Sequence, residues 1–443
     1  MFVDRKKEFQ ILENEYNQNQ FRFLVLYGRR RVGKTTLIKH FINKHKGIYF
    51  LATIENETLL INKFKNIVAD YFDDAFLRSL SLNSFEQIFG YLANKNEKLI
   101  IVIDEFQYLA KVNPAISSIF QTIIDEYLQN KNIFLILCGS IISLMYKETL
   151  SYSSPLYGRR TANIKLSQLK FEYINEFINK DIETQIEIYS ILGGVPKYLE
   201  MFDFKKDIFS SISKNILDKD SFLYNEPYFL LQDEVSETFT YFSILEVIAN
   251  GNHKIGDIAK AIQKPVTSIT SFIKKLIDLE LIYKDIPITE NHKSKKGLYF
   301  IKDNFLRFWF SYVFSYKSQL EIGNIEFVIK KLKLTFSEFV SKTYEDLAIE
   351  YVLNNFEVNR CGRWWDKNTE IDVVGIADDF VIFGECKWQN RKVTMKVLND
   401  LIEKSKKIEA KNKKYILFSK RGFSDELVKF ANKNENIVLK CLI

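Results

Sequence analysis

Unbroken apolar runs at residues 23–27, 99–103 and 134–138 are typical of buried strands. A strand that is apolar on both faces belongs inside a parallel sheet that helices cover on both sides. After the first run, apolar side chains between residues 37 and 42 follow a helical spacing. We therefore predict that the first part of the chain is an α/β domain built on a parallel sheet.

The middle of the chain has a different pattern. Helical stretches at residues 242–248, 255–262 and 265–276 precede short β-type runs at 281–284 and 298–300. This order resembles a winged helix, which implies that the third helix would face a DNA major groove or phosphates. The polar residues of that helix are Thr267, Ser268, Thr270, Ser271 and Lys274. A lid or a protein-contact module is the alternative, because a fold alone does not fix a function.

The last part of the chain again alternates between helix and strand. Its predicted elements are a helix at 335–355, two strands around 371–375 and 380–387, a helix at 397–408, a strand at 415–418, a helix at 424–431 and a strand at 437–442. Two consecutive strands joined by a turn are expected to pair antiparallel. The pattern predicts a second α/β domain.

Length and composition narrow the class of protein. At roughly 150 residues for each domain, a chain of 443 residues suggests about three domains. Only 16 Gly and 6 Pro argue against collagen-like, low-complexity and turn-dense all-β chains. The cysteines (Cys138, Cys361, Cys386 and Cys441) lie far apart, so neither a disulfide framework nor a zinc site is indicated. With no signal core and no membrane-spanning run, we expect a cytoplasmic protein without a membrane partner.

The net charge of +7 is unevenly distributed. Residues 387–443 carry 15 Lys and Arg against 6 Asp and Glu, and residues 251–302 carry 10 Lys against 5 acids, which leaves −7 for the rest. Two basic blocks on an acidic chain suggest two surfaces for a polyanion such as nucleic acid. The alternative is a set of solvated lysine faces.

A phosphate-binding motif follows the first predicted strand. It has the form GxxxxGK[ST] and consists of Gly28, Arg29, Arg30, Arg31, Val32, Gly33, Lys34 and Thr35, followed by Thr36. Backbone N–H groups of such a loop wrap phosphates at a helix N-terminus. Lys34 would reach the β- and γ-phosphates of ATP, and the Thr35 hydroxyl would bind Mg²⁺.

Two further apolar runs end in polar residues that fit the same chemistry. Asp104 would help hold Mg²⁺, and Glu105 would polarise the attacking water. Ser140 follows the third run and would sense the γ-phosphate; a turn serine is the alternative. These residues all stand at the carboxyl ends of predicted parallel strands, where an open α/β sheet binds its ligand.

Together these motifs resemble the archaeal-type ATPases of the AAA+ and signal-transducing P-loop group, over about the first 230 residues. The resemblance implies contacts to the adenine from Phe2, Val3 and Arg5, and from Pro196 in Gly194-Val195-Pro196. It also implies an arginine finger at Arg159 or Arg160; a phosphate-independent salt bridge is the alternative. A finger that acts in trans would require a homo-oligomer.

A second group of charged residues lies in the predicted C-terminal domain. Asp372 falls on one strand, and Glu385 and Lys387 share one face of the next. Asp and Glu-x-Lys after an acidic helix resemble the PD-(D/E)XK nuclease fold, here with Glu370-Ile371-Asp372 in place of Pro-Asp. The resemblance implies that Asp372 and Glu385, completed by Glu345, bind Mg²⁺ or Mn²⁺. Lys387 would position water or stabilise developing charge.

Neighbouring residues extend this resemblance to a nuclease-like domain that is often fused to archaeal-type ATPases. Gly362-Arg363-Trp364-Trp365 matches it, although tryptophans 364, 365 and 388 are expected to pack rather than stack on bases. Lysines 404, 406, 407 and 411 are predicted to face away from the apolar stripe of their helix, where a DNA backbone would pass.

We therefore predict an α/β protein with five segments: a P-loop ATPase core at 1–165, a helical lid at 166–235, a winged helix at 236–305, a helical linker at 306–333 and a restriction-endonuclease-like domain at 334–443. The predicted function is ATP hydrolysis coupled to a metal-dependent nuclease acting on DNA. The alternative is an ATP-driven binding switch, for DNA or protein, that does not cleave.

Overall fold

The computed structural model describes residues 3–95, 97–291, 294 and 296–442. The chain divides into two compact units. The first contains residues 1–169 and 195–197, and the second contains residues 170–194 and 198–443. The predicted end of the ATPase core, after residue 165, lies close to the observed division after Leu169.

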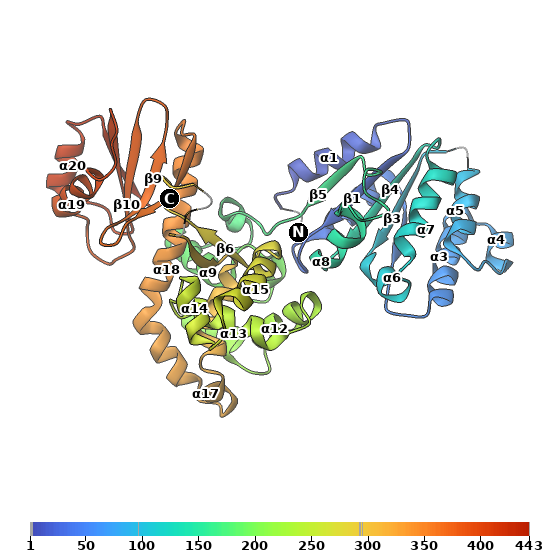
Figure 1. The fold of residues 1–443 in the computed structure, drawn as a ribbon, viewed down its shortest axis with the longest axis horizontal. Helices are drawn as coiled ribbons and strands as arrows, with labels where there is room; N and C mark the ends of the chain where they lie inside the picture. Colours follow the sequence, from blue (N-terminus) through green and yellow to red (C-terminus); the bar gives the residue numbers. More distant parts are fainter. Residues whose placement is uncertain (1–2, 96, 292–293, 295, 443) are drawn as a thin grey trace. The chain divides into compact units, whose positions relative to one another are not determined.

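The first unit is an α/β domain whose five strands are all parallel (Figure 1). The sheet order is β2-β3-β4-β1-β5. Its elements are α1 (Lys6–Tyr16), β1 (Arg22–Tyr27), α2 (Lys34–His45), β2 (Ile48–Leu51), α3 (Glu57–Phe72), α4 (Ala75–Ser79), α5 (Phe85–Ala93), β3 (Leu99–Asp104), α6 (Gln107–Val112), α7 (Ile116–Thr122), η1 (Ile123–Leu128), β4 (Ile133–Gly139), α8 (Ile142–Met145), η2 (Tyr146–Leu150) and β5 (Ala162–Lys165).

The apolar runs are buried on both faces of this sheet, as predicted. Every residue of β3 and β4 is buried. Ile101 and Ile103 belong to a core shared with α3, α5 and α7, whereas Ile100 and Val102 belong to a core shared with α1 and α2. Successive side chains of a strand point to opposite faces, so one apolar run supplies both cores.

The second unit begins with helices and a small antiparallel sheet. Its first elements are η3 (Phe171–Glu176), α9 (Ile182–Leu192), α10 (Pro196–Glu200), α11 (Ile208–Ile212), η4 (Ser213–Leu217), α12 (Phe222–Glu234), α13 (Thr238–Ala249), α14 (Ile255–Ala261), α15 (Val266–Asp278), β6 (Ile282–Asp285), β7 (Leu298–Ile301), α16 (Asn304–Phe308), η5 (Trp309–Phe314) and α17 (Lys317–Glu321). The sequence of α13 to β7, with β6 and β7 antiparallel, matches the predicted order of elements. Its assignment as a winged helix stays a prediction.

The second unit ends in a five-stranded mixed sheet. The elements are α18 (Ile325–Asn355), β8 (Arg360–Trp365), β9 (Glu370–Ile376), β10 (Val381–Lys387), α19 (Met395–Ser405), β11 (Lys413–Ser419), α20 (Asp425–Ala431) and β12 (Ile437–Cys441). The order is β12-β11-β10-β9-β8, antiparallel from β8 to β10 and parallel from β10 to β12.

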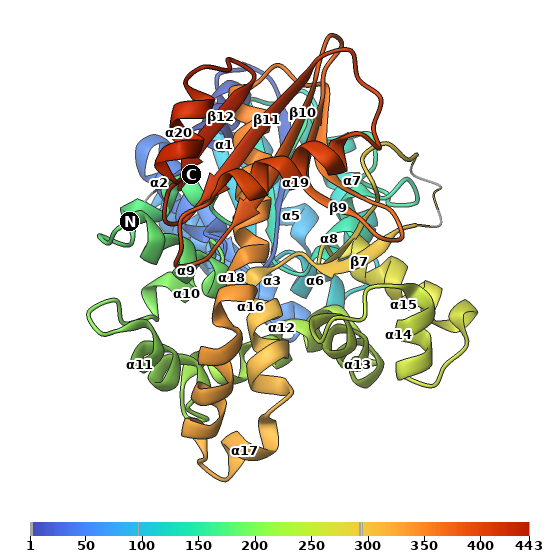
Figure 2. The same cartoon turned by 90° about the vertical axis from the view of Figure 1, so that its left-hand side faces the viewer.

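Helices cover both faces of this mixed sheet (Figure 2). Leu398 and Leu401 of α19 share a core with Phe383, whereas Val352 of α18 approaches Gly375 on the opposite face. The helix predicted at 335–355 begins earlier, at Ile325, because Val328 and other apolar side chains in its first turns are buried. The α18 helix therefore runs through the predicted boundary at residue 334.

Candidate functional site

The phosphate-binding loop connects β1 to α2, as the motif predicts. Gly33 has φ of 99° directly before the helix, a backbone conformation that side chains disfavour. At Gly28 a Cβ atom would lie 2.2 Å from the carbonyl oxygen of Leu166, so no side chain fits there. Glycine is therefore favoured at the two motif positions for different reasons: the backbone conformation at Gly33 and the lack of space for a side chain at Gly28.

Lys34 is buried inside this loop, with 6% of its surface exposed. Its Nζ donates hydrogen bonds to the carbonyl oxygens of Gly28 and Arg29, each at 2.8 Å. Burial lowers the pKa of Lys34, and the acids Glu105 and Asp104 oppose that shift. The ammonium is thus held in the loop by neutral acceptors, in position to bind phosphate oxygens.

Asp104, at the end of β3, accepts hydrogen bonds from two neutral hydroxyls. Thr35 Oγ1 donates to its Oδ2 at 3.1 Å, and the Tyr49 hydroxyl of β2 donates to the same oxygen at 2.7 Å. Burial and the charge of Asp104 raise the pKa of Tyr49, so the phenol remains a donor. Thr35 and Asp104 supply oxygen donors of the type that Mg²⁺ requires, and they are the residues that would hold it.

Glu105 is oriented by two polar side chains from neighbouring elements. Its φ is 57°, and its Oε2 accepts hydrogen bonds from Ser140 Oγ at 2.7 Å and from Gln107 Nε2. Gln107 is fully buried and also donates to Ser140 Oγ, at 3.2 Å. Ser140 therefore lies beside the predicted catalytic acid. Gln107 was not predicted, although a glutamine two residues after Glu105 was a signal.

The residues predicted to contact the adenine have unequal support. Arg5 is buried and donates to the carbonyl oxygens of Val32 (3.0 Å) and Ser167 (2.7 Å), which ties the N-terminal segment to the loop. Val3 is partly buried, and Phe2 lies outside the described residues. Pro196 and Lys197, the first two residues of α10, belong to the ATPase unit, whereas the rest of that helix belongs to the second unit. The adenine contacts themselves stay a prediction.

The two candidate finger arginines are engaged within the first unit. Arg159 forms a two-pronged ion pair with Asp125 of η1, at 2.8 and 2.7 Å. Arg160 donates to the carbonyl oxygens of Thr149 (3.4 Å) and Leu150 (3.3 Å). The salt bridge that the sequence left as the alternative is therefore present for Arg159, and the finger role stays a prediction.

In the C-terminal sheet, β9 and β10 pair antiparallel, as predicted, with Val373 opposite Gly384. This register brings Asp372 next to Glu385, and Asp372 Oδ2 accepts a hydrogen bond from the backbone N–H of Cys386 at 2.8 Å. The pairing of β8 with β9 shifts between Gly362 and Trp364, a β-bulge beside Asp372. Bulges redirect side chains and often lie next to active sites.

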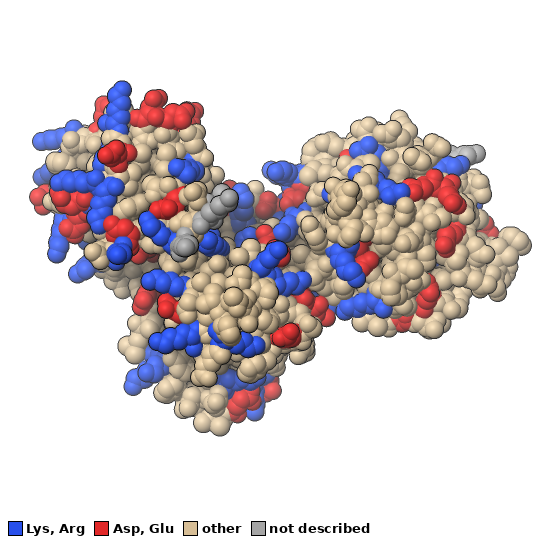
Figure 3. Space-filling view, viewed as in Figure 1, with Lys and Arg blue, Asp and Glu red and all other residues tan. Residues whose placement is uncertain are grey.

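Glu385 binds two lysines. Lys387 Nζ donates to its Oε1 at 2.7 Å, and Lys404 Nζ of α19 donates to Oε2 at 2.9 Å and to Oε1 at 3.1 Å. The Lys404 ammonium is therefore engaged with Glu385 in this structure, and its contact with a DNA backbone stays a prediction. Lys406 and Lys407 pair with Glu403 and Asp366. Figure 3 correspondingly shows lysine and arginine interspersed with acids on the visible face of this region.

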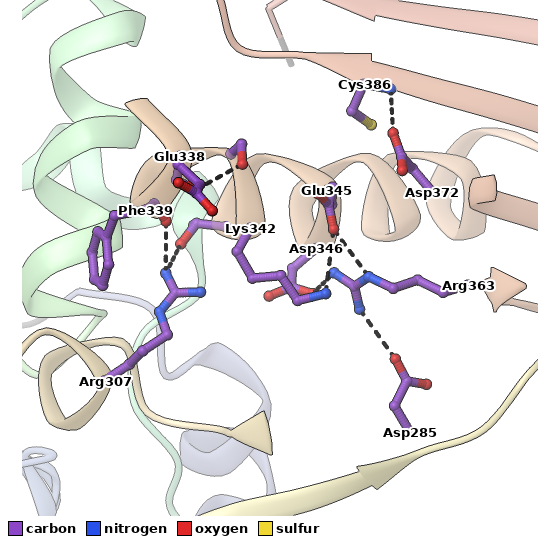
Figure 4. Close-up of polar contacts among 12 residues, drawn as sticks. Asp285, Arg307, Glu338, Phe339, Lys342, Glu345, Asp346, Arg363, Asp372 and Cys386 are labelled. Carbon is purple, nitrogen blue, oxygen red and sulfur yellow. Dashed lines mark hydrogen bonds and ion pairs between the residues drawn. The ribbon is translucent and has the colours of Figure 1, made fainter. Parts of the chain in front are cut away.

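Glu345 on α18 belongs to a network around Arg363 (Figure 4). Arg363, 4% exposed, donates to Glu345 at 3.1 Å, to Asp346 at 2.5 Å and to Asp285 of β6 at 3.4 Å. Lys342 also lies 3.3 Å from Glu345. The sequence did not predict this role for Arg363, although its place inside the Gly-Arg-Trp-Trp motif was a signal. Trp364 and Trp388 are buried in packing, as predicted.

Asp372, Glu385 and Glu345 influence one another electrostatically. Burial, followed by the charges of Glu385 and Glu345, raises the pKa of Asp372 to about 7. Two carboxylates in this position are the hard oxygen donors that Mg²⁺ or Mn²⁺ accepts. Among the described residues, however, no group of three or more His, Cys, Asp or Glu side chains is arranged to hold a metal ion. The predicted three-acid metal site therefore stays a prediction.

Comparison with known proteins agrees with the first unit. Residues 2–202 match a family model described as an ATPase domain predominantly from Archaea, and residues 309–398 match one described as archaeal and bacterial proteins of unknown function. The Walker-type ATPase PABY2304 of Pyrococcus abyssi shares the fold, with a TM-score of 0.53 and 20% identity over 70% of this chain and 96% of that one. The fold and the loop define an archaeal-type P-loop ATPase that binds and hydrolyses ATP.

The uncharacterized protein MJECL04 of Methanocaldococcus jannaschii is 38% identical over 418 residues, 92% of each chain. The chain therefore belongs to one family with MJECL04, in which an archaeal-type ATPase domain precedes a C-terminal region of unknown function. The uncharacterized ATP-binding protein MJ0423 of the same organism is 54% identical over 46 residues, 10% of this chain and 78% of that protein. Among the described residues, no helix is long and apolar enough to cross a membrane.

Proposed function

We propose that the protein couples ATP hydrolysis to a metal-dependent nuclease that acts on DNA, with its C-terminal sheet as the nuclease domain. One observation carries the proposal: Asp372 lies at a β-bulge beside Glu385 and Lys387 on adjoining strands. Two carboxylates can hold the metal ion that cleaves a phosphodiester, and a lysine can stabilise the charge that develops on the phosphate.

The roles of these side chains follow from their chemistry. Asp372 and Glu385 would hold Mg²⁺ or Mn²⁺, which supplies Lewis-acid chemistry when it is bound. The charge of Glu385 raises the pKa of Lys387 despite its burial. Lys387 is therefore a cation at neutral pH, suited to orient a water molecule or to stabilise charge on phosphate oxygens rather than to act as a base.

DNA binding is proposed for two regions. The polar residues of α15 named above (267, 268, 270, 271 and 274) are all exposed, as a helix in a major groove requires. The second region is the lysine-rich segment from residue 387 onward. We also propose that the protein can form a homo-oligomer in which Arg159 or Arg160 acts at the ATP site of a neighbouring subunit. To do so, the arginine would have to leave its present partners.

A specific observation favours a second function, an ATP-driven DNA- or protein-binding switch that does not cleave. Glu385 is bound to two lysines, and Glu345 is bound to Arg363. Ion pairs of this kind neutralise the acids that a metal site would use. In that case the C-terminal sheet would bind its partner through shape and charge alone.

The experiment is incubation of supercoiled plasmid with Mg²⁺ or Mn²⁺, with and without ATP, using the full-length chain. The variants are Asp372→Ala and Lys387→Ala, and the matched control is Asp379→Ala, an exposed acid in the turn between β9 and β10. We expect nicking by wild type and Asp379→Ala only. Equal behaviour of wild type and both site variants on DNA and on RNA would exclude nuclease chemistry and leave the switch.

A further inference from the structure

Lys404 contacts the proposed nuclease site from helix α19, whereas Asp372, Glu385 and Lys387 lie on the paired strands β9 and β10. Its side chain extends from α19, near the helix C-terminus, to both carboxylate oxygens of Glu385. The Glu385 side chain is 8% exposed, whereas the Lys404 side chain is 30% exposed. Lys404 is thus a partly solvent-exposed side chain whose ammonium group binds a buried acid.

The charges around Glu385 explain why a second lysine lies there. Asp372, which is half-buried, and Glu385, which is buried, lie side by side on adjoining strands, and two negative charges this close repel each other. Lys387 alone would balance one of the two charges, and Lys404 brings the second. The two ammonium groups together supply the charge that one divalent cation would supply.

We propose that Lys404 competes with the divalent cation for Glu385 and, once displaced, binds a phosphate of the nucleic acid. This inference rests on the proposed nuclease function and adds to it a fourth site residue. Lys387 lies two residues from Glu385 on the same strand, so its ammonium remains close by. Lys404 has a long flexible side chain on a separate helix and is free to exchange a carboxylate for a phosphate.

The neighbouring lysines provide matched controls. Lys407, three residues further along, pairs with Asp366 and Thr369 in a more exposed position, with 41% of its side chain accessible. Substituting Lys407 removes the same charge from the same region without touching Glu385. Arginine at position 404 would retain the charge near Glu385.

The test is calorimetric titration of full-length protein with Mn²⁺ in the absence of nucleotide. We expect Lys404→Met to bind Mn²⁺ about tenfold more tightly than wild type, because a competing ammonium is gone. Lys407→Met and Lys404→Arg should resemble wild type, and Asp372→Ala measures Mn²⁺ bound elsewhere. With Ca²⁺ present, the salt dependence of duplex binding should decrease by about one unit of slope in Lys404→Met. The slope should not change in Lys44→Met, an exposed lysine outside the two regions proposed to bind DNA.

The outcomes separate the two proposals. If wild type, Lys404→Met and Lys407→Met bind Mn²⁺ equally well, and more tightly than Asp372→Ala does, the role of Lys404 is wrong and the metal site stands. If none of them exceeds the Asp372→Ala background, metal-dependent cleavage is excluded, and the role of Lys404 with it. An unchanged salt slope in Lys404→Met would overturn its contact with phosphate.

Discussion

The two acidic sites of this protein differ in what surrounds their carboxylates. In the ATPase unit, Asp104 and Glu105 accept hydrogen bonds from neutral donors, such as the hydroxyls of Tyr49 and Ser140. In the C-terminal sheet, Glu385 binds two ammonium groups. Neutral donors orient a carboxylate without balancing its negative charge, so the charge remains available to a metal ion. A lysine ammonium balances that charge in an ion pair.

This difference indicates how each site would meet its ligands. In the ATPase site, the hydroxyls of Thr35, Tyr49 and Ser140 orient Asp104 and Glu105 through neutral hydrogen bonds, which suits these acids to receive Mg²⁺ and a phosphate chain. In the C-terminal site, the proposed metal ion would have to replace ammonium groups, and Arg363 would have to release Glu345 before that acid could join. The first site is therefore preorganised, and the second depends on an exchange of partners.

The largest effect is expected from Lys34→Ala. Removal of the loop ammonium should lower ATP hydrolysis by roughly 100-fold or more, because no other group replaces its contact with the phosphates. Phosphate release by full-length protein measures it. Lys44→Ala, at the exposed end of the same helix, should hydrolyse ATP like wild type. Comparable loss in both variants would contradict the assignment.

Arg363→Met should be the most destabilising change in the C-terminal site. Three acids would lose their shared buried partner, at a cost of roughly 3 to 5 kcal/mol in the free energy of unfolding. Urea denaturation measures this value. Arg421→Met removes an ion pair to Glu183 from a side chain that is 48% exposed, so it should cost about 1 kcal/mol or less. Equal losses would show that the Arg363 network is not a buried one.

Protonation of Asp372 should make stability depend on pH. Its folded pKa of about 7 lies above the ordinary value, so the folded state binds the proton more tightly than the unfolded chain. Stability should therefore be greatest below about pH 4 as far as this group is concerned, and fall by roughly 1 to 4 kcal/mol as the pH rises through 7.

Asp372→Asn keeps an acceptor for the Cys386 N–H and removes the charge. Urea unfolding in EDTA, at about pH 5 and about pH 8, should show a smaller pH effect in Asp372→Asn than in wild type. Identical pH effects in the two proteins would mean that Asp372 titrates normally.

Tyr49→Phe is expected to have the smallest effect. Asp104 would lose one of its orienting hydroxyls, and the Mg²⁺ concentration for half-maximal ATP hydrolysis should rise by roughly 3- to 10-fold. Tyr91→Phe is the matched control, because its hydroxyl bonds Asp74 away from the loop. An unchanged Mg²⁺ requirement in Tyr49→Phe would show that the Thr35 contact suffices.

The sequence predicted those parts of both sites that are formed by residues close together in the chain. The loop from Gly28 to Thr35 and the acids at the end of β3 follow from a motif and a buried apolar run. The proximity of Asp372 and Glu385 follows from the pairing of two consecutive strands joined by a turn. Such features depend on residues close together in the chain, so a pattern is enough to find them.

The missed residues come from elements that only tertiary packing brings to the sites. Tyr49 reaches Asp104 from another strand, and Arg363 meets acids on α18 and β6. For Lys404, helical spacing placed the residue away from the apolar stripe, but it did not reveal the ion pair with Glu385. The spacing of residues along a helix predicts which side of the helix each residue occupies. The partner of a long, flexible lysine depends instead on which charged group lies within reach in the folded structure.

The coupling of the two sites is tested most directly by the rate of plasmid cleavage as a function of ATP, measured for wild type and Lys34→Ala with the same Mg²⁺ concentration. We predict that ATP changes the wild-type rate several-fold, leaves the Lys34→Ala rate unchanged, and has no effect on the inactive Asp372→Ala. Cleavage by wild type that is indifferent to ATP, and equal to that of Lys34→Ala, would contradict the coupling of ATP hydrolysis to the C-terminal site.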